Sequence, residues 1–335
     1  MNGAKGGSRK FCNEPVILAW THFFSSNLRD MLESNFSGKC DYRCIVTDDK
    51  RYIDFSDAIV FHIRDLNIHD LPKKRFNNQF YVFLLYESPH NTGLIQVPDN
   101  FFNLTMTYRY DSDIFDPYGI LKKIDINTSD DMMWNWDEVK KIAINRKEMV
   151  LYLVSNCHTS SKREVYVKQL QNFLNITQRG KCNGIPCSDE CARNLRANHR
   201  FYLAFENSVC EDYVTEKVFT NMENLLVPIV LKKDLYSNIL PTGSYIAADE
   251  FKSPRELARY LEFLSQNTSA YLKYLEWTKY YQKPTRMDAS CALCKYLHEH
   301  VNDIKPKIIH NIRSWWFDGN CIPDYALRLL AAKAH

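Results

Sequence analysis

The fold class is indicated most clearly by residues 199–231, HRFYLAFENSVCEDYVTEKVFTNMENLLVPIVL. Its apolar run Phe201–Phe205 predicts a buried strand, a helix is expected from about Asp212, and Val227–Leu231 predicts a second buried strand. Continuous apolar strands of this kind are typical of a parallel sheet that is covered on both faces. The stretch therefore predicts an α/β fold.

The same alternation continues on both sides of this stretch. The polar segment 125–147 separates two such arrays, so the sequence predicts two Rossmann-like domains that face a central cleft, where ligands bind beyond the carboxyl ends of the strands. The further expected strands are 16–22, 44–47, 58–62, 81–87, 149–155 and 245–248, and the further expected helices are 25–33, 162–174, 253–266 and 268–280.

Composition narrows the class of protein. The 335 residues include 43 Lys and Arg against 40 Asp and Glu, a net charge of +3, which argues against a nucleic-acid partner held through its phosphates. The longest apolar run, 80–86, is far shorter than the roughly 20 residues that span a bilayer. The length is sufficient for about two domains.

The 11 cysteines indicate the secretory pathway, although scattered buried thiols of a cytosolic protein are the alternative. Five Asn-x-Ser/Thr sequons support the secretory interpretation, but residues 1–10 lack the apolar region of a signal peptide. Either a membrane anchor precedes this chain or the secretory interpretation is wrong. The candidate glycosylation sites are Asn35, Asn103, Asn127, Asn175 and Asn267.

Several common sites are absent from the sequence, among them G-x-G-x-x-G, the P-loop, G-x-S-x-G and H-E-x-x-H. Asp111 and Asp113 form a D-x-D pair that could hold Mn²⁺ or Mg²⁺, but a solvated loop is the favoured interpretation. Cys291-x-x-Cys294 could be half of a zinc site completed by Cys187 and Cys191, although disulfide partners that tether the tail are favoured.

The stretch 199–231 also carries the strongest candidate site. Polar residues, among them Asn207, follow the strand directly, and Glu216 and Lys217 lie in the expected first turns of the helix. A helix N-terminus and a lysine suit a diphosphate, and a carboxylate suits the hydroxyls of a ribose. We therefore favour a nucleoside-diphosphate site over a solvated helix face.

At this point the sequence resembles the α1,3-fucosyltransferase family, glycosyltransferase family 10. FYLAFENSVCEDYVTEKVF, followed by VPIVL, is similar to the family signature. Leu231-Lys232-Lys233 departs from the pattern, because the family has a glycine there. Other similar blocks follow in family order: DAIVFHIRDL (57–66), ESPHNTG (87–93), FNLTMTYRYDSDIFDPYG (102–119), LVSNC (153–157), GSYIAADEF (243–251) and CALC (291–294).

The resemblance implies a GT-B fold and inverting transfer from GDP-fucose. It implies an acceptor domain at 11–145, a GDP-fucose domain at 146–285 and a tail at 286–335 tethered by disulfides to the first domain. Glu87 is the implied catalytic base, and His90 and Asn91 are acceptor-side candidates. The implied donor-binding residues are Arg163, Tyr202, Asn207, Tyr213, Glu216 and Lys217.

The resemblance also implies partners and location. No cofactor or metal is required, with Mn²⁺ at most a stimulant, and the family acts in the Golgi lumen behind an N-terminal membrane anchor. LVSNC, the loop 182–191 and SWWFDGNC (314–321) favour the Asn-linked core GlcNAc of glycoproteins as acceptor. LacNAc or LacdiNAc antennae are the alternative acceptors, and a catalytically silent glycan-binding relative is the alternative function.

Disulfide partners are the last expectation from the resemblance. Cys291 and Cys294 are expected to pair with two of Cys12, Cys40 and Cys44, which leaves the other pairings and the odd eleventh thiol open. The remaining candidates for disulfides are Cys182, Cys187, Cys191 and Cys321.

Overall fold

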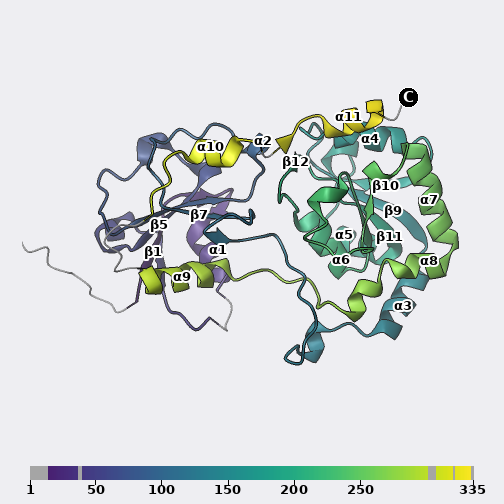
Figure 1. The fold of residues 1–335 in the computed structure, drawn as a ribbon, viewed down its shortest axis with the longest axis horizontal. Coiled ribbons are helices and arrows are strands. Elements are labelled where there is room, and N and C mark those ends of the chain that lie inside the picture. The colour runs from purple at the N-terminus through teal and green to yellow at the C-terminus, as the bar shows by residue number, and fades with distance from the viewer. Residues whose placement is uncertain (1–13, 37–39, 301–306, 320, 333–335) are drawn as a thin grey trace, which may run out of the picture. The chain divides into compact units, whose positions relative to one another are not determined.

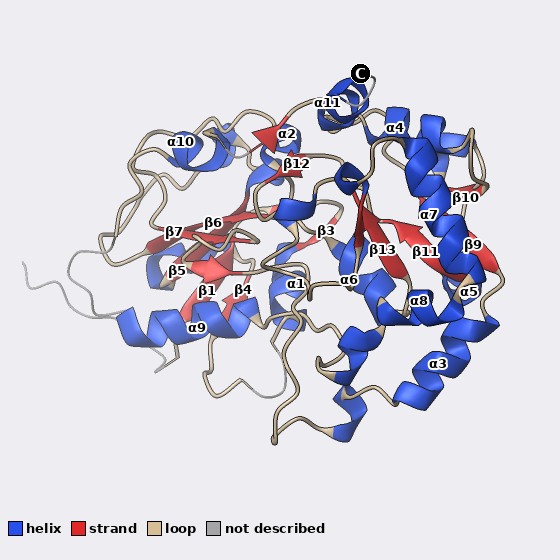
Figure 2. Ribbon diagram, turned by 45° about the vertical axis from the view of Figure 1, so that its right-hand side comes forward, coloured by secondary structure: helices blue, strands red, loops and turns tan. Residues whose placement is uncertain are grey.

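The computed structural model describes residues 14–36, 40–300, 307–319 and 321–332, and these form two compact units (Figure 1). Unit 1 contains the described residues up to Asp116 together with Asp288–Gly319. Unit 2 contains Pro117–Met287 and the described residues after 320. Each unit is built on a parallel sheet with helices (Figure 2), which confirms the predicted α/β class.

This division differs from the boundaries expected after residues 145 and 285. The segment that follows Pro117 belongs to unit 2, because Ile120 bridges to Thr285 and Lys123 bridges to Tyr281. The tail is likewise divided between the two units.

The sheet of unit 1 has the strand order β4-β1-β5-β6-β7-β8, and every neighbouring pair is parallel. The longest pairing runs from Ala58 opposite Phe80 to His62 opposite Leu84. All carboxyl ends therefore lie at one edge of this sheet. The strands are β1 (Val16–Ala19), β4 (Ile45–Thr47), β5 (Ala58–His62), β6 (Phe80–Leu85), β7 (Leu104–Thr107) and β8 (Ile114–Phe115).

Both faces of this sheet are covered, because successive side chains of a strand point to opposite faces. One face packs against α1 (Leu28–Ser34) and α9 (Ala289–His300) through an aliphatic cluster. The other face is aromatic: Phe83 meets Trp316 of α10 (Ile312–Phe317) with ring centroids 5.5 Å apart. Figure 1 shows α9 and α10 on opposite sides of these strands.

The sheet of unit 2 has the order β10-β9-β11-β13-β14 and is also parallel throughout. One face packs against α4, α7 and α11, and the other face packs against α6. This is the doubly wound arrangement that the sequence predicts. The elements are β9 (Glu148–Leu153), β10 (Ile176–Arg179), β11 (His199–Leu203), β13 (Val227–Val230), β14 (Ile246–Ala247), α4 (Arg163–Leu170), α6 (Glu216–Glu223), α7 (Pro254–Gln266) and α11 (Tyr325–Ala332).

Shorter elements complete the two units. Residues Lys50–Phe55, Ile63–Asp65 and Ile68–Asp70 form 3-10 helices at the rim of the unit 1 sheet. The remaining elements include two short hairpins, β2 (His22–Phe23) with β3 (Ser26–Asn27) and β12 (Val209–Cys210) with β15 (Cys321–Ile322), and the helices α2 (Pro89–Thr92), α3 (Trp136–Asn145), α5 (Asp189–Asn198) and α8 (Thr268–Lys273).

Two expectations about helices were wrong. The helix expected from about Asp212 begins at Glu216, because Asp212 adopts a positive φ of 57° in the turn after β12. The single helix expected over 268–280 ends at Lys273, and a separate 3-10 helix follows at Glu276–Lys279.

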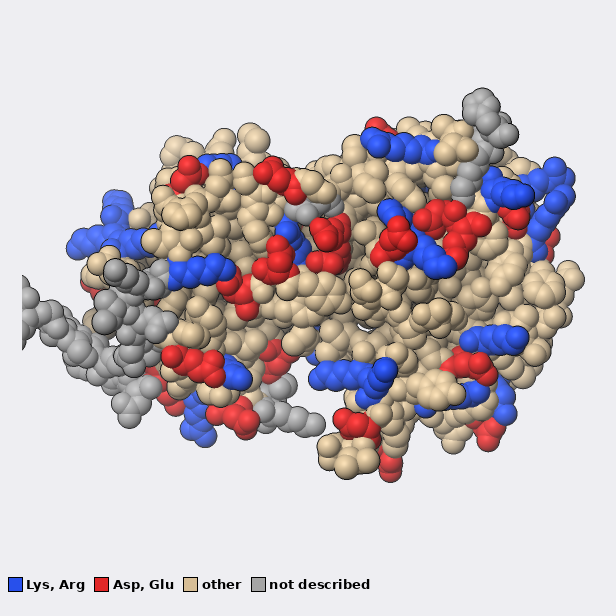
Figure 3. Space-filling view, viewed as in Figure 1, with Lys and Arg blue, Asp and Glu red and all other residues tan. Residues whose placement is uncertain are grey.

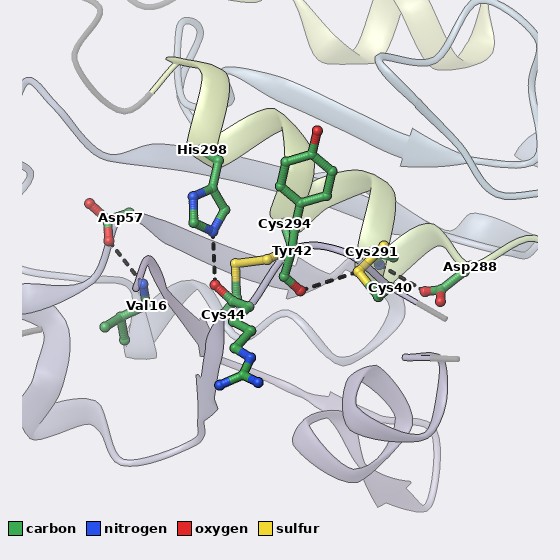
Figure 4. The surroundings of a disulfide bond; sticks show 10 residues. Val16, Cys40, Tyr42, Cys44, Asp57, Asp288, Cys291, Cys294 and His298 are labelled. Atoms are coloured by element: carbon green, nitrogen blue, oxygen red, sulfur yellow. Dashed lines mark hydrogen bonds between the residues drawn. A yellow bond between two sulfur atoms is a disulfide. The ribbon is translucent and has the colours of Figure 1, made fainter. Parts of the chain in front are cut away.

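Five disulfides link described cysteines, and two of them join α9 to the segment before β4 (Figure 4). These two are Cys40–Cys291 and Cys44–Cys294, and both lie within unit 1. Basic and acidic side chains are interspersed on the face shown in Figure 3, in line with the net charge of +3. Within the described part of the chain, no helix has the length and apolar character needed to cross a bilayer.

Candidate donor-binding site

A cavity of about 320 Å³ lies in unit 2, where β9 and β11 end and α6 begins. Ligands bind to parallel α/β sheets at this edge. The cavity collects five of the six residues expected to bind the donor, and Tyr213 is the exception. It is lined by Leu153, Val154, Ser155, Asn156, Arg163, Arg196, Tyr202, Asn207, Glu216, Lys217, Thr220 and Asn221.

The first turn of α6 supplies the anion-binding end of the cavity. Thr215 caps this helix, and its hydroxyl accepts a hydrogen bond from the backbone N–H of Lys217. The positive end of the helix dipole and the Lys217 ammonium both favour a negatively charged ligand at this point.

Glu206 lies behind this turn and holds it in place. The side chain is 3% exposed. Its Oε1 accepts hydrogen bonds from the backbone N–H and the hydroxyl of Thr215, at 2.9 and 2.8 Å. Its Oε2 lies 3.0 Å from Nζ of Lys217. Glu206 therefore binds both the cap of α6 and the lysine that lines the cavity.

The Lys217 ammonium stays protonated despite its burial. Desolvation lowers the pKa of Lys217, but the Glu206 carboxylate more than offsets this, and Glu216 adds to it, so the pKa ends above its ordinary value. The Glu216 Oε1 lies 3.3 Å from the same Nζ, but that carboxylate is half exposed. A permanent positive charge at this point suits a diphosphate.

Arg163 lies at the start of α4 and is 3% exposed. Its Nη1 donates to the backbone oxygen of Phe205, and its Nη2 donates to that of Asn156 over 3.2 Å. Among the described residues, neither Nε of Arg163 nor Oδ1 of Asn207 has a hydrogen-bond partner, although both atoms are buried. Buried polar atoms are normally paired, so a donor and an acceptor here are available to a ligand.

The wall formed by residues 153–156 is contacted from behind by the turn at Gly180. Gly180 has a φ of 112°, and a Cβ at this position would lie 2.2 Å from the backbone oxygen of Val154. Only glycine fits such an approach. The disulfide Cys157–Cys182 ties the end of the wall to the same turn.

Tyr202 contributes a neutral phenol to the cavity. Burial raises the pKa of Tyr202, and its hydroxyl donates to the backbone oxygen of Leu153 over 3.3 Å. Tyr213 is 2% exposed and packs edge-on against Tyr118, with ring centroids 6.3 Å apart. Its place is therefore in the packing of unit 2 and not in the wall of the cavity.

The expected catalytic base, Glu87, lies in unit 1, two residues after β6. Its side chain is 24% exposed, and its Oε1 lies 3.9 Å from Nη1 of Arg64. The same Nη1 donates to the backbone oxygen of Asn91 over 2.6 Å. The acceptor-side candidates His90 and Asn91 lie on α2, and the side chain of His90 is exposed.

The two carboxylates of the D-x-D pair bind separate partners. Asp111 pairs with Arg109 over 2.6 Å and accepts from the indole N–H of Trp315. Asp113 accepts from the backbone N–H and the hydroxyl of Thr105 and lies 2.6 Å from Nζ of Lys307. The structure therefore gives both aspartates a role in the packing of unit 1.

The remaining candidate cysteines are joined in disulfides, so the zinc alternative is wrong. Cys187 is bonded to Cys191, and the thiols of Cys291 and Cys294 are bonded to Cys40 and Cys44. Cys182 and Cys321 have the partners Cys157 and Cys210, which were not among the candidates. Cys12 lies outside the described residues.

The five sequons differ in accessibility. Asn127 and Asn175 are exposed, whereas Asn35 and Asn267 are half-buried. Asn103 is 1% exposed, and its Nδ2 donates to the backbone oxygen of Lys307, which makes it the least accessible of the five. A glycan on that atom would have to displace this buried hydrogen bond.

Two residues of the candidate site were not predicted from the sequence. Arg196 adds a third cation to the cavity, and it lies on α5, a helix that was not among those expected from the sequence. Glu206 was recognised only as one of several polar residues after a strand. Its pairing with Lys217 spans 11 residues, and the sequence contains no direct sign of it.

Comparison with known proteins places the chain in a family. Residues 143–315 match "Glycosyltransferase family 10 (fucosyltransferase) C-term", and residues 12–119 match "Fucosyltransferase, N-terminal". Alpha-(1,3)-fucosyltransferase C of Drosophila melanogaster is 34% identical over 94% of this chain and 80% of its own length. A human relative, 4-galactosyl-N-acetylglucosaminide 3-alpha-L-fucosyltransferase FUT6, is 33% identical over 84% of this chain and 77% of its own length.

The fold has a counterpart among solved structures. A crystal structure of an alpha1,3-fucosyltransferase with GDP-fucose superimposes with a TM-score of 0.54, covering 92% of this chain and 96% of that one. The two sequences are 14% identical, so this likeness concerns the fold alone. Because both family models and the sequences of the relatives match, the chain belongs to glycosyltransferase family 10, the fucosyltransferases.

Proposed function

We propose that this protein transfers L-fucose from GDP-β-L-fucose, in α1,3 linkage, to GlcNAc of glycoprotein N-glycans. The observation that carries the proposal is the cavity of unit 2, which Arg163, Arg196 and Lys217 line and where Glu216 is the one lining carboxylate among the described residues. Three cations suit a diphosphate, and the carboxylate suits the two hydroxyls of a ribose.

The proposed reaction inverts the configuration of the fucose. Glu87 takes the proton of the acceptor hydroxyl while that oxygen forms its bond to the anomeric carbon of fucose. The bond from this carbon to the diphosphate oxygen breaks, and GDP leaves with the electron pair. Lys217 and Arg163 stabilise the negative charge that develops on the departing diphosphate. The place of Glu87 at the carboxyl end of β6 supports its role as the base.

For the acceptor we propose the Asn-linked core GlcNAc. The blocks LVSNC and SWWFDGNC and the cysteine-rich loop 182–191 support this choice, because they resemble the enzymes that act on the core. The second candidate is a LacNAc or LacdiNAc antenna. It is favoured by the name of the human relative, which states a 4-galactosyl-N-acetylglucosaminide acceptor.

The proposed location is the Golgi lumen. Five disulfides among the described residues support an oxidising compartment. GDP-fucose as the donor, with no required cofactor, completes the proposal.

A transfer assay tests the proposal. Purified protein is incubated with GDP-fucose and either a core N-glycan glycopeptide or N-acetyllactosamine, and the linkage of the product is determined by NMR. We expect α1,3-fucosylated product and one GDP released per transfer, with the glycopeptide as the better acceptor. GDP binding without turnover on any acceptor would leave the silent glycan-binding relative as the function.

A further inference from the structure

A second cavity, of about 420 Å³, lies within unit 1 and has no role in the mechanism above. Its walls come from the segments after β1, β4 and β5. Ligand pockets usually measure about 300–1,000 Å³, so this space can hold a small ligand. The residues that matter below are Trp20, Asn27, Asp48, Lys50, Asp65 and Asp70.

Three aspartates of this cavity are oriented by donors from the protein. Oδ2 of Asp48 accepts from the Asn27 amide over 2.8 Å, and Oδ2 of Asp65 accepts from the backbone N–H of Phe24 over 2.7 Å. Oδ2 of Asp70 pairs with the Lys50 ammonium. Among the described residues, no donor is bonded to the other oxygen of any of the three. The cavity therefore presents several oriented acceptors to a ligand.

The aromatic wall of the cavity is also held in place. The Trp20 indole N–H donates to the backbone oxygen of Asp70 over 2.6 Å, and the Lys50 ammonium lies 4.5 Å from the centroid of the Trp20 ring. Lys50 thus contacts both the ring and the Asp70 carboxylate. These contacts join the ring, the ammonium and the carboxylate on one side of the cavity.

The charges and spacing identify the kind of ligand. Three carboxylates against one ammonium disfavour an anion such as a phosphate. A metal ion requires ligand atoms close together, and in the described part of the chain no three such atoms of this cavity lie within 4.8 Å of one another. Separated acceptors suit a larger neutral ligand with several hydroxyl donors, which describes a sugar ring.

The cavity shares its sheet edge with the proposed base. Trp20 follows β1, Asp65 follows β5 and Glu87 follows β6, and these three strands are neighbours in a parallel sheet. Neighbouring strands lie about 4.8 Å apart, so β1 and β6 are separated by roughly 10 Å. Arg64, which pairs with Glu87, is the residue before Asp65.

We propose that this cavity binds a saccharide unit of the acceptor glycan, adjacent to the unit that receives fucose. The inference rests on the proposed function, because it takes the glycan as the substrate of Glu87. It assigns Asp48 and Asp70 to the recognition of sugar hydroxyls, and it makes the cavity a determinant of acceptor choice.

The test is the variant Asp48→Ala, with Asp54→Ala as its matched control. Asp54 is an exposed aspartate of the same unit that does not line the cavity. A hydrogen bond to a charged group contributes about 1.5 kcal/mol or more, so we expect the KM for the core glycopeptide to rise about tenfold in Asp48→Ala. The kcat and the KM for GDP-fucose should stay as in the control, because only uniform binding of the acceptor is lost.

Three outcomes would overturn the inference. They are an acceptor KM equal to that of the control, an equal rise in KM for a single GlcNAc glycoside that cannot reach the cavity, and a chelator that reproduces the defect in the wild-type protein. Saturation-transfer NMR of the glycopeptide with the intact protein, without donor, reports binding independently of turnover. Binding that depends on Asp48 is expected, and binding insensitive to Asp48→Ala would also overturn the inference. Failure of the proposed function is distinguishable from all of these outcomes, because the wild-type protein itself would then transfer no fucose.

Discussion

The substitution Glu206→Gln tests how the donor cavity keeps its charge. Glu206 is 3% exposed and lies 3.0 Å from the Lys217 ammonium, which has 19% of its side chain exposed. The glutamine has no charge, so Glu216 would be the one carboxylate left beside the buried ammonium among the described residues. Breaking a buried ion pair by removing one partner costs about 3–5 kcal/mol. Because Glu216 remains 3.3 Å away, we expect a loss near the lower end, about 3 kcal/mol.

Glu216→Gln is the matched control, because it removes the other carboxylate beside the same ammonium. Glu216 is 51% exposed, and an exposed ion pair is worth at most about 1 kcal/mol. Urea unfolding followed by circular dichroism gives both free energies. A calorimetric titration with GDP should show at least tenfold weaker binding in Glu206→Gln, because the Lys217 ammonium loses the charged partner that holds it, whereas the glutamine oxygen can still accept from Thr215.

The contrast between the two carboxylates decides the result. If Glu206→Gln unfolds with the same free energy as Glu216→Gln, burial of the pair contributes nothing to stability. If it also binds GDP as tightly as the wild-type protein, Glu206 does not position Lys217. Either observation would refute this account of the cavity.

Three further predictions concern catalysis, the disulfides and pH. Glu87→Gln should lower kcat by about 10²–10⁴ while GDP affinity stays unchanged, and wild-type turnover in this variant would remove Glu87 as the base. Removing Cys40–Cys291 or Cys44–Cys294 alone by Cys→Ala pairs should lower the free energy of unfolding in urea by about 2–3 kcal/mol, because the other disulfide still closes the long loop. Removing both disulfides should cost more than twice as much. A variant without both disulfides that is as stable as a variant without one would contradict this. Burial lowers the pKa of His62 and of His199 below the ordinary value, with Asp65 and the Leu195 carbonyl opposing this only in part. Below about pH 6.5 the unfolded chain therefore takes up protons more readily than the folded chain does. The free energy of unfolding should decrease as the pH is lowered through this range, by up to about 1.4 kcal/mol per pH unit and per histidine. His199→Asn should lessen this fall in a series of melting curves, and an unchanged slope would show that His199 does not cause it.

The fold was most predictable where local signals agree. α7 was expected over 253–266 and forms at Pro254–Gln266, because Ser253 caps the helix and accepts from the backbone N–H of Glu256. β5 matches the expected 58–62 at both ends, since a continuous apolar run there is bounded by polar residues. Such signals lie within a few residues of one another.

The missed features depend on distant partners. The start of α6 was displaced because β12 pairs with β15, and Cys210 meets Cys321 across 111 residues. α3 was assigned to the segment between domains because Val139 and Ala143 are its only buried residues among those described. The sequence contains no local sign of such contacts.

The candidate sites were likewise predictable only where their residues are close together in the sequence. Asn207, Glu216 and Lys217 were found because they follow one strand or begin one helix. The unit 1 cavity was not found, because its walls come from three separate strand ends. Parallel sheets bring such ends to one edge only when the chain folds.

The most direct measurement of the central claim is fucosyl transfer itself. The wild-type protein is incubated with GDP-fucose labelled in the sugar and a core N-glycan glycopeptide, and both the labelled product and released GDP are counted. We expect α1,3-fucosylated glycopeptide in an amount equal to the released GDP, and a signal that is lower by about 10²–10⁴ in Glu87→Gln. Binding of GDP in the cavity of unit 2 without any labelled product from the wild-type protein would contradict it.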